Sequence, residues 1–115
     1  MMENPPLAKK GNFVHIYDFR VKPGTGAEFI RLFTEFDQSG TNPFHHSDGQ
    51  VTDGVLCQDD GDPDHFYLLA EWKDKAAHRS IREAMMKDPN KPAFMELILD
   101  LDKGSYVPTY ADVVL

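Results

Sequence analysis

Two histidines and an arginine are the side chains of this 115-residue sequence best suited to moving protons and stabilising charge. His78 is expected one turn into a helix, close to Trp72, and Arg82 follows four residues later on the same helix face. His15 alternates with aromatic residues along a predicted strand. A histidine in water ionises at about pH 6.5, which suits a general base, and an arginine can stabilise an oxyanion. We therefore take His78, His15 and Arg82 as candidate catalytic residues.

Large apolar side chains near these groups are candidates for the wall of a substrate cavity. Trp72 ends a predicted strand, where its flat ring could stack on an aromatic compound, and Tyr17 could orient a carbonyl group. Phe33 and Met85 lie on the apolar stripes of two predicted helices. The four residues are our candidate substrate-binding residues.

Each candidate also has a purely structural explanation. The sequence leaves the functional and the structural explanation open. His78 and Arg82 would then be solvated helix residues, and His15 would be a core histidine held by a hydrogen bond. Tyr17 and Trp72 would be packed core aromatics.

No metal site is predicted. His45, His46 and Asp48 share one loop, but adjacent histidines diverge and no third ligand has suitable spacing. The acidic run 59–64 lacks the residue order of a calcium loop and is expected to be a solvated hairpin tip. Motifs for serine or cysteine nucleophiles, phosphate-binding loops and dinucleotide binding are absent from the sequence.

Composition indicates one soluble domain with an acidic surface. The sequence is 41% hydrophobic and 27% charged, and 19 acidic residues against 12 Lys and Arg give a formal charge of −7. Such a surface repels nucleic acid and anionic lipid. No apolar run approaches the ~20 residues needed to cross a bilayer, and residues 1–6 lack a secretory signal. We expect a cytoplasmic protein without nucleic-acid or membrane partners, in which the single cysteine, Cys57, is a small core residue.

Periodicity and turn residues divide the chain into a flexible N-terminal arm, residues 1–11, and a single domain, residues 12–115. The pattern predicts strands at 13–21, 51–58, 65–72 and 105–115, a loop at 41–50, and helices starting at 25 and 74 and after 92.

Helix ends and buried faces follow from the same pattern. Thr25 and Glu28 have capping-box spacing, and Asp74 can cap the second helix. The buried stripes are expected to be Phe29, Leu32, Phe33 and Phe36 in the first helix, and Ala77, Ile81, Ala84 and Met85 in the second.

The element order predicts an α+β, ferredoxin-like βαββαβ fold, with helices on one face of a four-stranded antiparallel sheet. At least two strands also carry apolar residues on the opposite face, which one chain leaves uncovered. We therefore expect a face-to-face homodimer with two-fold symmetry.

Two segments together resemble the antibiotic biosynthesis monooxygenase family. The first is Tyr17-Asp18-Phe19-Arg20-Val21-Lys22-Pro23-Gly24, followed by Glu28-Phe29 and an aromatic helix. The second runs from the acidic hairpin 59–66 to Glu71-Trp72-Lys73-Asp74-Lys75-Ala76-Ala77. The likeness covers about residues 13–114.

The resemblance implies a dimeric α/β barrel and a monooxygenase that oxidises an aromatic phenol, quinol or polyketide-like molecule with molecular oxygen, without metal or flavin. Many members carry a histidine where this chain has Ile81; His78 stands where some members have a tyrosine. Haem-degrading relatives use a histidine in the short helix, and residues 92–101 contain none. Two alternatives stay open: a non-catalytic barrel that binds a small ligand or serves a stress response, and an isomerase or lyase of a small metabolite.

Overall fold

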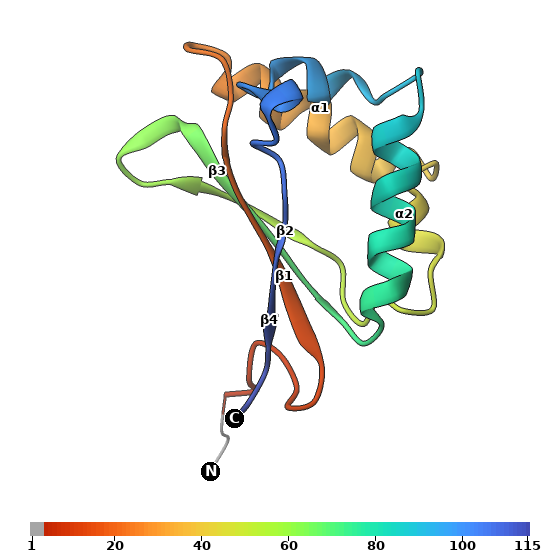
Figure 1. Ribbon diagram of the computed structural model, residues 1–115. Coiled ribbons are helices and arrows are strands. Elements are labelled where there is room, and N and C mark those ends of the chain that lie inside the picture. Colours follow the sequence, from red (N-terminus) through yellow and green to blue (C-terminus); the bar gives the residue numbers. More distant parts are fainter. Residues whose placement is uncertain (1–3) are drawn as a thin grey trace.

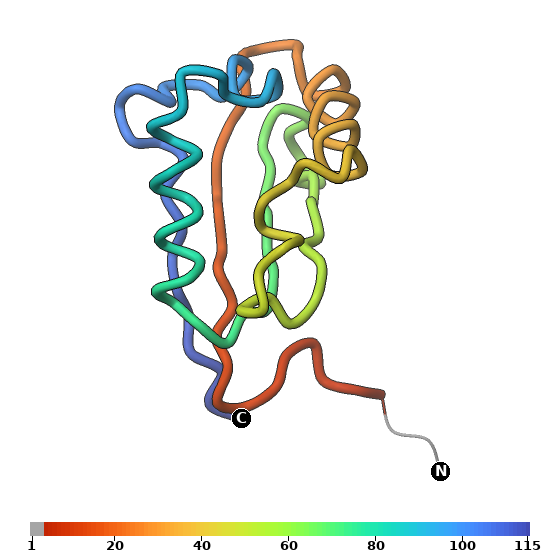
Figure 2. The backbone as a smooth tube through the Cα atoms, turned by 90° about the vertical axis from the view of Figure 1, so that its right-hand side faces the viewer, coloured from red at the N-terminus to blue at the C-terminus, as the bar shows by residue number. Residues whose placement is uncertain are grey.

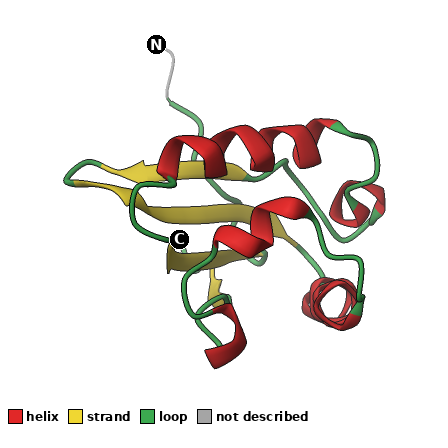
Figure 3. Ribbon diagram, turned by 90° about the horizontal axis from the view of Figure 1, so that it is seen from above, coloured by secondary structure: helices red, strands yellow, loops and turns green. Residues whose placement is uncertain are grey.

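The computed structural model describes residues 4–115 and confirms the predicted fold class. Four antiparallel strands form one sheet in the order β2-β3-β1-β4. The helices lie on one face of this sheet (Figure 1), and Figure 3 shows the same helices and strands from above. The strands are β1 (Phe13–Arg20), β2 (Val55–Asp59), β3 (Asp62–Trp72) and β4 (Thr109–Asp112), and the α-helices are α1 (Gly26–Gln38) and α2 (Lys75–Lys87). Short 3-10 helices span Pro43–His46, Ala93–Leu97 and Leu101–Lys103.

The central strand pair sets the positions of the candidate residues. β1 pairs with β3 without interruption, so His15 lies opposite Ala70 and Tyr17 lies opposite Leu68. Alternate residues of both strands point to the helix-covered face. His15 and Tyr17 therefore share that face with Trp72, which pairs with Phe13 at the end of the ladder.

An aromatic core joins the sheet to α1. Phe29 is fully buried, with ring centroids 5.4 Å from Phe19 and 5.0 Å from Phe66. Phe33, one helical turn later, has its ring centroid 5.0 Å from that of Phe94, in the 3-10 helix Ala93–Leu97 that follows α2. Burial of these rings is the main contribution to stability on this side of the sheet.

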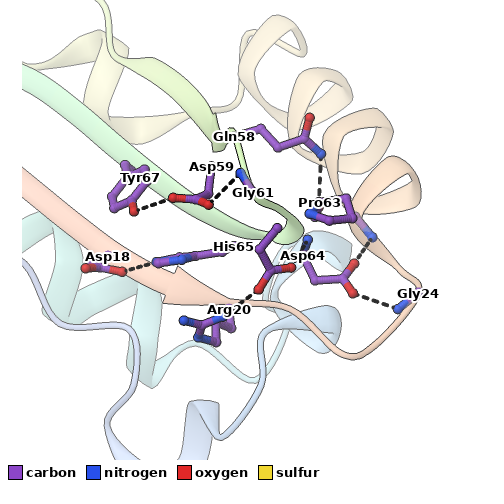
Figure 4. A network of polar contacts seen from close by, with 12 residues as sticks. Asp18, Arg20, Gly24, Gln58, Asp59, Gly61, Pro63, Asp64, His65 and Tyr67 are labelled. Carbon is purple, nitrogen blue, oxygen red and sulfur yellow. Dashed lines mark hydrogen bonds and ion pairs between the residues drawn. The ribbon is translucent and has the colours of Figure 1, made fainter.

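The N-terminus of α1 is stabilised by the β2–β3 hairpin, which corrects the predicted capping box. Thr25 makes no side-chain cap, and Glu28 pairs with Arg31. The carboxylate of Asp64 instead accepts hydrogen bonds of 2.9 Å from the backbone amides of Gly24 and Gly26 (Figure 4). The acidic hairpin is therefore a structural support of the helix as well as a solvated turn.

Asp64→Ala is expected to lower the free energy of unfolding by about 1 to 2 kcal/mol, because two amides at the helix start lose their acceptor. Urea unfolding followed by circular dichroism measures this change. Asp60→Ala removes the same charge from the exposed turn of the same hairpin and is the matched control. Equal stability of the two variants would contradict the capping role.

Other local predictions also need correction. β2 begins at Val55, not Val51, and β4 covers only part of 105–115. Asp74 does cap α2 by accepting from the Ala77 amide at 3.0 Å, but the only fully buried residue of that helix is His78, and Ala84 is exposed. Ala77, Ile81 and Met85 of the predicted stripe do pack, partly buried, against the core. The stripe is wrong at Ala84, and its most buried position is the polar residue His78.

The face of the sheet opposite the helices is uncovered in a single chain. Its apolar residues include Val14, Ile16, Val55, Tyr67 and Leu69, with Val55 50% exposed. Polar side chains border it: the His65 Nε2 atom lies 2.5 Å from an Asp18 carboxylate oxygen (Figure 4).

Cys57 belongs to this uncovered face and is exposed, so its predicted place in the core is wrong. Strand alternation explains the difference, because the neighbouring Leu56 takes the helix-facing position opposite Leu68.

The N-terminal arm is attached at its end nearest the domain. The backbone amide of Lys9 donates to Glu71 at 2.9 Å, and that of Gly11 donates to the Val113 carbonyl at 3.1 Å. Residues 1–3 lie outside the described part, and the flexibility of the arm stays a prediction. Within residues 4–115, no helix has both the length and the apolar character needed to cross a membrane.

Candidate functional site

A small cavity lies between the helix-covered face of the sheet, α1, α2 and the loop after α1. Figure 2 views the molecule from this side, with α2 (teal) along one edge and α1 (orange) and the loop (yellow) along the other. Its volume is about 50 Å³, which is room for a few water molecules. Six residues predicted from the sequence line it: His15, Tyr17, Phe33, His78, Arg82 and Met85.

The two histidines come from different elements and lie side by side. His15 on β1 and His78 on α2 have ring centroids 4.6 Å apart, with 33° between the ring planes. Both are almost completely buried, with 5% and 1% of their surfaces exposed. The structure thus excludes a solvated helix position for His78, one of the two explanations that the sequence left open.

Their hydrogen bonding differs. His78 Nδ1 forms a 2.7 Å hydrogen bond with the Tyr110 hydroxyl of β4, which fixes the orientation of the ring. The Nδ1 atom of His15 is buried and has no hydrogen-bond partner among residues 4–115. A buried ring nitrogen without a partner is unusual in folded proteins, and a functional role is one explanation for it.

Burial keeps both imidazoles neutral. Desolvation lowers the pKa of His15 to about 4, partly offset by the Leu68 backbone. Desolvation, then the nearby His15 and the cations Arg82 and Arg79, lower the pKa of His78 to about 3. The sequence argument for a base titrating near neutrality is therefore wrong for the protein without ligand.

Arg82 is a half-buried cation with no acidic partner. Its guanidinium donates to the carbonyl oxygen of Tyr106, and its buried Nε atom has no partner. No carboxylate within residues 4–115 lies within 4.0 Å of it. Burial raises the pKa of Tyr17, an effect that the neighbouring Arg82 opposes. The cavity wall therefore carries a positive charge at Arg82 that no carboxylate neutralises directly.

Trp72 does not line the cavity, contrary to the proposed stacking role. It is fully buried, and its ring packs edge-on against His78 with centroids 4.9 Å apart. The indole therefore packs against the imidazole of His78 outside the cavity, and Trp72 does not contact a ligand bound there.

Tyr106 and Tyr110 are residues of the site that sequence reasoning missed. Tyr106 stacks on Tyr17 at 4.4 Å and lines the cavity. Both tyrosines lie in the last extended segment, far from the other site residues in sequence, and only the pairing of β4 with β1 brings them close. Alternate placement of aromatic residues in that segment was the only available signal.

The loop histidines have separate positions. His45 lines the cavity with its Nε2 atom 3.2 Å from Asp37, whereas His46 bonds the Gly40 carbonyl at 2.8 Å. Across residues 4–115, no three His, Cys, Asp or Glu side chains gather closely enough to hold a metal ion.

Acid is expected to destabilise the fold through His15. Its pKa is about 6.5 unfolded and about 4 folded, so between these values the unfolded chain binds more protons and stability falls as the pH is lowered. The loss at pH 4 relative to pH 7 is about 3 kcal/mol for this residue, and His78 adds to it. Urea unfolding at both pH values measures it. His15→Gln should flatten the dependence of the free energy of unfolding on pH. The control His46→Gln, in the exposed loop, should leave it unchanged. An equal slope in both variants would contradict the assignment of the acid effect to His15.

Several solved structures of other proteins are similar to this chain. A protein from Chloroflexus aurantiacus named as an antibiotic biosynthesis monooxygenase matches with a TM-score of 0.56 and 20% identity, over 90% of this chain and 94% of that one. One from Nitrosomonas europaea with the same description matches with a TM-score of 0.63 and 12% identity, over 91% and 92%. A variant of SnoaB from Streptomyces nogalater, described as a cofactor-independent oxygenase, matches with a TM-score of 0.54 and 16% identity, over 91% and 93%.

These identities show a shared fold. The curated proteins include no match to this sequence. The family model for antibiotic biosynthesis monooxygenases matches residues 12–85, which is most of the chain and includes β1, α1, the β2–β3 hairpin and much of α2. The chain belongs to the antibiotic biosynthesis monooxygenase family.

Proposed function

We propose that this protein is a cofactor-independent monooxygenase that oxidises an aromatic phenol, quinol or polyketide-like molecule with molecular oxygen. The supporting observation is the aromatic-walled cavity in which His15, His78 and Arg82 meet, in a chain of this family. The description of SnoaB as a cofactor-independent oxygenase agrees with this choice.

The proposed reaction begins from an oxyanion of the substrate, because ground-state oxygen accepts single electrons and an anion donates them most readily. One electron passes to oxygen, and the resulting radical and superoxide combine into a carbon-bound peroxide. A proton then gives the hydroperoxide, and loss of water leaves a carbonyl group. One oxygen atom ends in the product and the other in water, while the substrate loses two hydrogens.

The residues have matching roles in this proposal. Arg82 stabilises the oxyanion and then the superoxide by charge. His15 and His78 exchange protons with the peroxide, and Tyr110 positions His78 through the Nδ1 hydrogen bond. Phe33 and Met85 exclude water from the apolar side of the cavity.

The functional unit in this proposal is a homodimer formed through the uncovered sheet face. An apolar face of this kind is unusual in a monomer, and Val55 and Cys57 on it are exposed. Light scattering at micromolar concentration should give about twice the 13.1 kDa of one chain. A mass near one chain would contradict the pairing.

Oxygen uptake tests the activity. A panel of naphthols, anthrones and quinols is offered to the protein, with uptake above buffer expected for at least one compound. His46→Gln, in an exposed loop, serves as the control variant and should retain this uptake. No uptake with any compound would argue against the proposal.

The small cavity favours one second candidate, an isomerase or lyase of a small oxygenated metabolite. A volume of about 50 Å³ admits a bicyclic ring only if side chains of the wall move. Turnover by such an enzyme would persist under argon, whereas that of the monooxygenase would stop.

A further inference from the structure

We propose that the cavity binds its substrate as an oxyanion already formed in solution, and so selects phenols and enols acidic enough to be ionised at neutral pH. This inference rests on the proposed function for its substrate class. The inference adds the ionisation state in which the substrate enters the cavity, and this state sets how acidic the substrate must be.

The first argument is the uncompensated charge in the cavity wall. Arg82 is half-buried, and a cation that is partly removed from water without a counter-ion is stabilised by an anion that binds beside it. Arg82 has its Nε atom buried and unpartnered, and its hydrogen bond to Tyr106 goes to a neutral carbonyl. The single carboxylate of the cavity wall, Asp37, is engaged with His45 at 3.2 Å.

The second argument is that the histidines are ill suited to remove a proton from a weakly acidic phenol. Burial lowers both pKa values, to about 4 for His15 and about 3 for His78. Proton transfer from an ordinary phenol, with a pKa of about 10, to either histidine is strongly unfavourable before any stabilisation by the site. A substrate that arrives ionised avoids this step and leaves the neutral rings as hydrogen-bond donors.

The third argument is the set of polar groups that line the cavity. β1 contributes His15 and Tyr17, and α2 contributes His78 and Arg82. Burial raises the pKa values of Tyr17 and Tyr106, so both hydroxyls stay protonated and can donate to an anion. Among residues 4–115, Asp37 is the only carboxylate of the wall, and it lies against His45. The oxyanion is therefore expected beside Arg82.

The wall can also admit an aromatic ring. Met85, Met86 and Met95 line the cavity together with Phe36. Methionine side chains are flexible and polarisable and repack around ligands at low cost. A single ring bearing one oxyanion is therefore the smallest ligand that satisfies both the charge and the apolar surface.

A pair of nearly isosteric probes tests the inference without oxygen. 4-Nitrophenol ionises near neutral pH, whereas 4-nitroaniline stays neutral. Anaerobic titrations followed by the absorbance of each probe, at pH values from 6 to 9 where His15 and His78 stay neutral, give dissociation constants. We expect nitrophenolate to bind at least about tenfold tighter than nitroaniline, with the apparent ionisation of bound nitrophenol shifted at least about one pH unit toward acid.

Two substitutions locate the effect. Arg82→Gln should abolish the preference for the anion and leave the affinity for nitroaniline unchanged within about threefold. Lys87→Gln removes the same charge from the exposed side of the same helix and should leave the preference intact. Equal affinity of wild type for the two probes, or no binding of nitrophenolate at millimolar concentration, overturns the inference whether or not the Arg82 variant folds.

The outcome is separable from that of the proposed function. Anion-selective binding without oxygen uptake would leave this inference standing and refute the oxygenase. Oxygen uptake that is fastest with weakly acidic phenols would support the oxygenase and refute this inference.

Discussion

Gly26→Ala is expected to lower the free energy of unfolding by more than about 3 kcal/mol, although alanine is the better helix former by about 1 kcal/mol. Gly26 begins α1, and a Cβ atom there would lie 2.0 Å from the backbone carbonyl oxygen of Pro63. The obstacle is backbone, so relief requires the helix to move away from the β2–β3 hairpin. That movement breaks the hydrogen bond from Gly26 to Asp64 and loosens the packing of Phe29.

Urea unfolding followed by circular dichroism provides the measurement. Gly61→Ala is the matched control, because the nearest atom to its added Cβ is a side-chain oxygen at 3.5 Å and its backbone has no positive φ. Its stability should stay within about 0.5 kcal/mol of wild type. Similar stabilities of the two variants would mean that the contact between helix and hairpin is not as close as described.

His78→Phe is expected to lower kcat about 10²- to 10⁴-fold with the phenol that gives the largest oxygen uptake. Phenylalanine keeps a planar ring in the buried position but has neither nitrogen, so no proton reaches the peroxide from this side. The affinity for the substrate should change much less, because Arg82 and the apolar wall remain. Steady-state oxygen uptake across substrate concentrations separates kcat from KM.

Tyr110→Phe distinguishes catalysis from packing. The substitution removes only the hydroxyl that bonds His78 Nδ1, so the imidazole stays but loses its fixed orientation. We expect a fall in kcat of about tenfold and little change in stability. An unchanged kcat in the His78 variant would exclude this residue from the reaction, and an unchanged kcat in the Tyr110 variant alone would exclude the positioning role.

Much of the fold could be predicted from the sequence because its signals are local. Alternation around Phe13 to Phe19 located β1, and the Asp74 cap located the start of α2. Asp64 could not be recognised as the cap of α1, since it lies 38 residues from Gly26 and reaches it only through the hairpin. The Thr25 and Glu28 spacing was a weaker local signal that tertiary structure overrode.

The residues of the site could be predicted from the sequence, but their protonation states and hydrogen bonds could not. His15, His78 and Arg82 could be selected by type and position, and they do line one cavity. Their environment depends on burial, which periodicity misjudged by assigning the core side of α2 to Ala84. The neutral imidazoles and the unpaired guanidinium arise from packing between β1 and α2, which no short sequence pattern encodes.

The contact between Trp72 and His78 has a spectroscopic consequence. Trp72 is the only tryptophan of the chain, so its fluorescence comes from one buried indole whose ring centroid is 4.9 Å from the imidazole. A protonated imidazole quenches a neighbouring indole more strongly than a neutral one. Emission intensity recorded during an acid titration therefore reports the charge of His78 as long as the fold persists, without a label or a substrate.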